Sequence, residues 1–205
     1  LVPFGGFFEM LQTTSSLREM RGAIRSCPGI RQRPAHVMVD PHCSHGLKGE
    51  IRIHQTSTPI MPAGTLLSVS NDIYCAGPEL TFIQMASETS LVGAVVLGYE
   101  FCGGYSHFSQ LISGFYDCPA LTSKSAITHV CNELPGMRGV KQARQALELV
   151  SENSRSPMET VTACMLSLPS TVGGLGFHTP SLNYRVDLGE TASRLAGLAS
   201  RRSCR

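Results

Sequence analysis

The hydrophobic pattern of this chain changes its period close to Pro78. Before that point short segments alternate apolar and polar residues, as in 49–57, where isoleucines alternate with Arg52 and His54. Such alternation predicts a half-buried strand. At Pro78 a proline followed by Glu79 opens a segment with helical spacing, which is typical of a helix start. The pattern therefore predicts an α+β chain that is rich in strands first and helical afterwards.

Further elements follow from the same reasoning. Two strands are expected within 64–77, on either side of the turn-prone pair Asn71-Asp72. Residues 140–150 form the clearest amphipathic helix. The remaining expected elements are a helix from Leu17 to Pro28, a strand at 35–40, helices at 78–90, 91–105, 121–134 and 157–168, and a strand at 182–188, with a loop over 106–120.

The composition break near 135–139 suggests two regions. We place the boundary between 106 and 139 and divide the chain into residues 1–120, a mixed α/β front region, and residues 121–205. The second region has just reached its sheet at 182–188. A strand without a partner is an aggregation hazard, so the sequence predicts that this region is the incomplete beginning of a larger domain.

The cysteine usage indicates a cellular compartment, whereas the net charge does not identify a binding partner. The net charge of +2 fits a nucleic-acid binder and a solvated surface of mixed sign equally well. The chain has eight cysteines, with no pair spaced as C-x-x-C. Cysteines within apolar runs behave as small buried hydrophobes, which indicates the reducing cytoplasm. No apolar run approaches the ~20 residues needed to cross a bilayer, so no membrane partner is expected.

Two motifs suggest ligands and have commoner explanations. His42, Cys43 and His45 form one tight group, whereas a structural zinc site needs four ligands in paired sets. The segment "GGLGF" at 173–177 follows an expected helix and precedes an expected strand, the reverse of a dinucleotide-binding loop. Both segments are interpreted as loops.

The segment "SPMET" at 156–160 opens an apolar helix with an acidic residue. With Ser156 as N-cap, Pro157 occupies the first helical position and Glu159 the third. This is the pattern of a capping box, in which Glu159 accepts a hydrogen bond from the N–H of Ser156. The alternative is that Glu159 is an active-site carboxylate.

A resemblance to known proteins bears on this choice. "SPMET", the glycine-rich loop and "LNYRV" at 182–186 resemble the very-short-patch-repair-like endonuclease domain of actinobacterial composite proteins, within the PD-(D/E)XK superfamily. The block at 69–106 is similar to the middle of the same proteins, whose front half is likened to AbiE-type antitoxins. The resemblance implies an antitoxin-like front region and the truncated beginning of a restriction-endonuclease-like α/β domain, so the chain is expected to be a fragment.

In such nucleases the glutamate of the first helix joins an Asp and a Glu from later strands around Mg²⁺. The resemblance therefore implies a catalytic and metal-binding role for Glu159, with Mg²⁺ bound in the intact protein only and an inactive fragment. Three functions are open. The first is a DNA-interacting fragment of an endonuclease-like protein. The second is a non-enzymatic, antitoxin-type DNA-binding regulator with a cognate toxin, in which Glu159 only caps its helix. The third is an interaction domain without a nucleic-acid role. The expected phosphate contacts are Arg18, Arg21, Arg25, Arg201 and Arg202.

Overall fold

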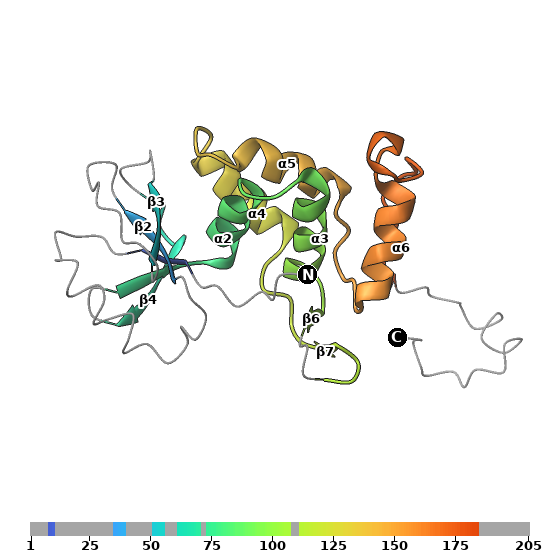
Figure 1. Cartoon of the computed structure of the whole chain (residues 1–205), viewed down its shortest axis with the longest axis horizontal. Coiled ribbons are helices and arrows are strands. Elements are labelled where there is room, and N and C mark those ends of the chain that lie inside the picture. Colours follow the sequence, from blue (N-terminus) through green and yellow to red (C-terminus); the bar gives the residue numbers. More distant parts are fainter. Residues whose placement is uncertain are drawn as a thin grey trace, which may run out of the picture.

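The computed structural model describes residues 8–10, 35–39, 51–55, 61–70, 73–107 and 111–184, and the side chains of 61–67, 75–107 and 111–184. Within these ranges the chain combines helices with two sheets, as expected for the α+β class (Figure 1). The expected helix that starts at Leu17 lies outside the described residues. So do the histidine–cysteine group at 42–45 and the C-terminal part of the strand expected at 182–188.

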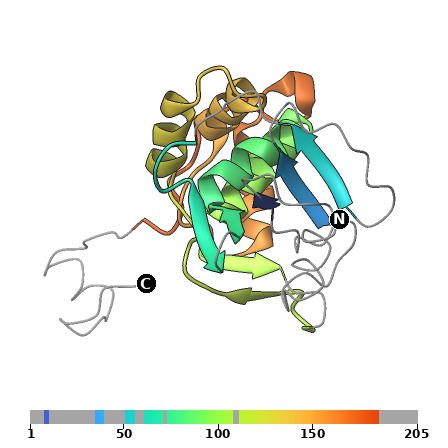
Figure 2. The same cartoon turned by 90° about the vertical axis from the view of Figure 1, so that its left-hand side faces the viewer.

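Five short strands form a mixed sheet in the order β3-β2-β1-β5-β4. Neighbouring strands β1, β2 and β3 are parallel, whereas β5 runs antiparallel to both β1 and β4. Figure 2 shows β2 and β3 side by side. The strands are β1 Phe8–Met10, β2 Ala35–Val39, β3 Ile51–Gln55, β4 Leu66–Ser70 and β5 Ile73–Ala76. The strands predicted at 35–40, 49–57 and 64–77 are confirmed, and β1 was not predicted.

The helices follow the sheet in the chain and lie to one side of it (Figure 1). They are α2 Pro78–Ala86, α3 Leu91–Phe101, α4 Lys124–Glu133, α5 Val140–Leu149 and α6 Pro157–Ser167, followed by a short 3₁₀ turn, η1 Ser170–Val172. All five helices were predicted. The amphipathic pattern of α5 is confirmed, because Val140, Ala143, Leu147 and Val150 are all buried.

The segment predicted as a loop at 106–120 contains part of a hairpin instead. Strands β6 Tyr105–His107 and β7 Phe115–Asp117 pair antiparallel. Tyr105 is buried and its ring lies edge-on to Phe115, with centroids 6.2 Å apart. A strand of three residues gives only a weak sequence signal, so the pairing depends on this tertiary contact.

One hydrophobic core joins α2, α3, α4, α5 and α6. Helix α3 lies at its centre and packs against α2, α5 and α6. Leu80, Phe82 and Ile83 of α2 are buried in the same core as Ile127 of α4 and Ala143 of α5. This core extends across residue 120, where the sequence analysis places the boundary between the two regions.

Candidate functional site

Helix α6 begins with the capping residues that its sequence predicts. Ser156 is the N-cap, and its hydroxyl accepts a hydrogen bond from the N–H of Glu159 at 3.2 Å. Pro157 occupies the first turn, where a proline costs no hydrogen bond. The helix therefore starts where the sequence indicates, and Glu159 lies in its first turn.

The carboxylate of Glu159 accepts hydrogen bonds from two N–H groups. Its Oε2 lies 2.9 Å from the backbone nitrogen of Arg155 and 2.8 Å from Nδ2 of Asn183. The predicted partner was the N–H of Ser156, and this detail is wrong. Ser156 is extended (φ −155°, ψ 155°), and in extended backbone successive N–H groups point to opposite sides, so the N–H of Arg155 faces the carboxylate instead.

Asn183 follows the glycine-rich loop, and its side chain connects this part of the chain to the start of α6. Its amide also donates to the carbonyl oxygen of Asn153 at 2.8 Å. Both asparagines have left-handed backbone conformations (φ 50° for Asn183 and 68° for Asn153), which asparagine tolerates better than most residues. The strand predicted from residue 182 is therefore wrong for 182–184, because a left-handed residue interrupts extended backbone.

Three buried hydroxyl groups at the start of α6 are joined by hydrogen bonds. The hydroxyl of Thr160 lies 2.9 Å from that of Tyr105 and 2.8 Å from that of Ser154. Burial raises the pKa of Tyr105 to about 12, partly offset by its hydrogen bond to Thr160. The phenol therefore stays protonated at neutral pH and links the β6–β7 hairpin to α6.

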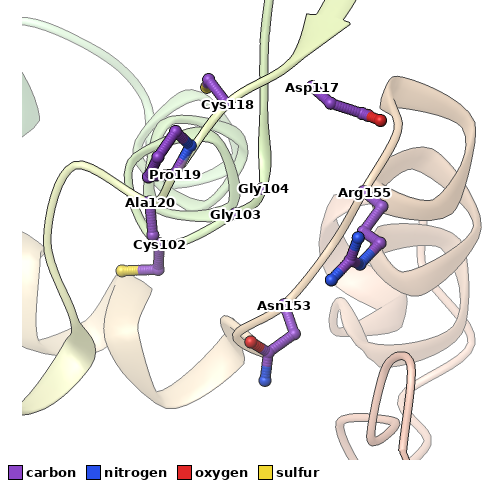
Figure 3. Close-up of a pocket in the computed structure, with 9 residues that line it drawn as sticks. All are labelled: Cys102, Gly103, Gly104, Asp117, Cys118, Pro119, Ala120, Asn153 and Arg155. Atoms are coloured by element: carbon purple, nitrogen blue, oxygen red, sulfur yellow. The ribbon is translucent and has the colours of Figure 1, made fainter. Parts of the chain in front are cut away.

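An open pocket of about 440 Å³ adjoins the start of α6 (Figure 3). Its walls come from the end of α3, from β7 and the segment after it, and from the segment that leads into α6. Asn153 and Arg155 belong both to this wall and to the hydrogen bonds around Glu159. Burial and the nearby Glu152 carboxylate raise the pKa of Cys102 to about 12, so this lining thiol is protonated and a poor nucleophile.

Of the catalytic, metal-binding and DNA-binding residues predicted from the sequence, the structure describes Glu159 alone. Arg18, Arg21, Arg25, Arg201 and Arg202 all lie outside the described residues. Within the ranges whose side chains are described, no three His, Cys, Asp or Glu side chains come together as metal ligands would. The roles of Asn183 and Asn153 were not predicted from the sequence. The available signal was the tendency of asparagine to adopt left-handed backbone at turns.

The charge of the chain is unevenly distributed between the described and the other residues. The ranges with described side chains hold five Lys and Arg against eight Asp and Glu, a formal charge of −3. The rest of the chain holds twelve and seven, a formal charge of +5. In the sequence, the basic residues are therefore concentrated between residues 18 and 52 and after residue 184.

The structure thus defines an α+β protein with a mixed sheet, a helical core and a capped helix start beside a pocket. In its described part no helix combines the length and hydrophobicity that crossing a bilayer requires. Searches against family models, curated proteins and solved structures found no match to this chain.

The hydrogen bonds of Glu159 give a stability prediction. Glu159→Ala removes the acceptor for Arg155 and Asn183, and we expect the free energy of unfolding to fall by about 1–2 kcal/mol. Urea unfolding followed by far-UV circular dichroism measures this. Glu159→Gln is the matched control, because its amide oxygen still accepts, and it should lose less than half as much. An alanine variant as stable as the parent protein would show that the two hydrogen bonds contribute nothing.

Proposed function

We propose that this chain is a DNA-interacting protein of the cytoplasm that binds DNA without cleaving it. The uneven distribution of charge supports the proposal most directly. The described ranges are net acidic, and the net positive charge belongs to the segments that carry Arg18, Arg21, Arg25, Arg201 and Arg202. Basic residues concentrated in a few segments are the electrostatic mark of phosphate binding.

The contacts of Glu159 favour binding over cleavage. Its Oε2 is committed to two N–H donors that hold the start of α6 and the segment around Asn183. A carboxylate that accepts these two hydrogen bonds holds two segments of the chain in place. This agrees with the antitoxin-type regulator, in which Glu159 is a helix cap and a cognate toxin is the protein partner. Cys102, Cys118, Cys131 and Cys164 are free thiols, which supports a reducing compartment.

A second candidate is the endonuclease-like protein that the resemblance implies. Both hydrogen bonds of Glu159 involve Oε2, and its Oε1 has no hydrogen-bond partner among the described residues. The side chain is only half-buried. One oxygen is thus open to a cation, and in an intact nuclease an Asp and a Glu from later strands would complete a Mg²⁺ site around it. Mg²⁺ would there activate water and stabilise the charge that develops on the phosphate.

The DNA-binding proposal predicts a strong salt dependence. The affinity for a labelled DNA duplex, measured by fluorescence anisotropy, should fall linearly on a plot of log K against log salt concentration. Replacing Arg201 and Arg202 by glutamine should weaken binding and reduce the slope by about 0.9 for each phosphate that is no longer neutralised. Lys141→Gln on α5 is the matched control and should leave the slope unchanged, because Lys141 lies on the net acidic helical part.

The same assay separates the candidates. Binding that survives EDTA and Glu159→Ala supports the regulator. Cleavage of the duplex that needs Mg²⁺ and is abolished in Glu159→Gln would overturn it in favour of the endonuclease. Absence of binding even at about 50 mM salt, where phosphate contacts are strong, would rule out both.

A further inference from the structure

The pocket beside the start of α6 has a floor of two glycines. Gly103 and Gly104 lie between the segment that carries Cys118 and the segment that carries Asn153 and Arg155 (Figure 3). A Cβ atom on Gly104 would lie 3.7 Å from Cγ of Arg155 and 3.7 Å from the carbonyl oxygen of Cys118. A side chain at residue 104 would therefore stand between the two walls and fill the space that the glycine leaves open.

Backbone hydrogen bonds hold both walls to this floor. The N–H of Gly104 donates to the carbonyl oxygen of Ser154 at 2.7 Å, and the N–H of Cys118 donates to the carbonyl oxygen of Gly104 at 3.1 Å. The N–H of Asn153 donates to the carbonyl oxygen of Cys102 at 3.3 Å. The shape of the pocket is thus fixed by the backbone before any ligand enters, which lowers the entropic cost of binding.

The polar side chains of the two walls are not used by the fold. Arg155 and Asp117 are exposed, and neither the guanidinium nor the carboxylate forms a hydrogen bond or an ion pair with the described residues. The bond from Arg155 to Glu159 uses the backbone N–H of Arg155 alone. Asn153 likewise bonds through its backbone, so its side-chain amide is also available to a ligand.

The opposite charges of the two walls indicate the chemistry of the ligand. A guanidinium binds a carboxylate with two parallel hydrogen bonds, and the amide of Asn153 can donate a third. The carboxylate of Asp117, on the other wall, suits an ammonium group. A simple anion would meet the like charge of Asp117, and a simple cation that of Arg155, so each is disfavoured. The volume of about 440 Å³ is sufficient for a small molecule.

We propose that this pocket binds a small zwitterion of the amino-acid type, with its carboxylate on Arg155 and its ammonium group on Asp117. The glycine floor allows the ligand to lie close to the backbone between the two walls. This binding does not depend on DNA, because it uses side chains of the described, net acidic part of the chain.

Binding of short amino acids to the full chain, in buffer without DNA, tests the proposal. The probes are glycine, β-alanine, 4-aminobutyrate and 6-aminohexanoate, in which the distance between the ammonium and carboxylate groups increases stepwise. Butyrate and butylamine carry only one of the two charges and are the matched controls. Titrations followed by ¹H–¹⁵N NMR should give saturable shifts with at least one amino acid, with a Kd about tenfold or more below that of butyrate.

Three variants connect this binding to the pocket. Arg155→Gln and Asp117→Asn should each raise the Kd about tenfold, because each removes one charged partner. Gly104→Val should abolish binding by filling the space. The φ of Gly104 is not positive, so the far-UV circular dichroism of this variant should be unchanged. Arg138→Gln removes the same charge from an arginine that pairs with Glu88, and this control should leave the Kd unchanged.

Three outcomes would overturn the proposal. If none of the four amino acids binds, the pocket has no site for a zwitterion. If butyrate binds as tightly as the amino acids and Asp117→Asn has no effect, the site takes simple anions. If binding persists in folded Gly104→Val, the ligand lies elsewhere. None of these results bears on the proposed function, because the assay contains no DNA.

Discussion

Phe82→Ala is expected to lower the free energy of unfolding by about 3–5 kcal/mol. The Phe82 side chain is fully buried on α2, and its ring lies 5.8 Å from that of Phe101 on α3. Alanine would leave a cavity between the two helices, and the packed core around it can collapse only in part.

Denaturant unfolding followed by circular dichroism measures this effect. Leu121→Ala is the control, because Leu121 is 59% exposed in a loop, and its change should stay within about 0.5 kcal/mol. The unfolding of both variants should remain a single transition, because α2 and α3 share their core with α4 and α5. Two separate transitions would instead show that the regions before and after residue 120 fold independently.

Gly139→Ala is expected to destabilise the protein by more than about 1 kcal/mol, through the backbone rather than a side chain. Gly139 is the N-cap of α5 and has φ 99°, which L-residues rarely adopt. A Cβ atom at this position would lie 2.1 Å from the carbonyl oxygen of Ile83 on α2. The substitution therefore adds strain at the helix start and forces α5 away from α2.

Gly136→Ala tests this interpretation three residues earlier. It has no positive φ, and a Cβ atom there would meet nothing within 4 Å. Alanine at 136 should be neutral or slightly stabilising, because it restricts the unfolded chain. Thermal unfolding of the two variants side by side makes the comparison. Equal effects at 136 and 139 would show that the approach of α5 to α2 does not constrain residue 139.

Much of the helical part was predictable because its signals are local. Ser156, Pro157 and Glu159 are neighbours in the chain, and their order predicted the first turn of α6. The burial of Val140 and Leu147 likewise follows from their spacing on one helix. The prediction of a strand at 182–184 was wrong. It was based on the apolar pattern and did not take into account that asparagine, here Asn183, readily adopts left-handed backbone.

The sequence by itself determined strands β2 to β5, the five helices and the residue at which α6 begins, because caps and hydrophobic periodicity act over a few residues. Tertiary structure alone decided the partners across the fold. Asn183 meets Glu159 from 24 residues away, and Tyr105 meets Thr160 from 55 residues away. Gly139 lies against the carbonyl of Ile83. Such contacts form only when the packed core brings together segments that lie far apart in the sequence. No local pattern of residues predicts them.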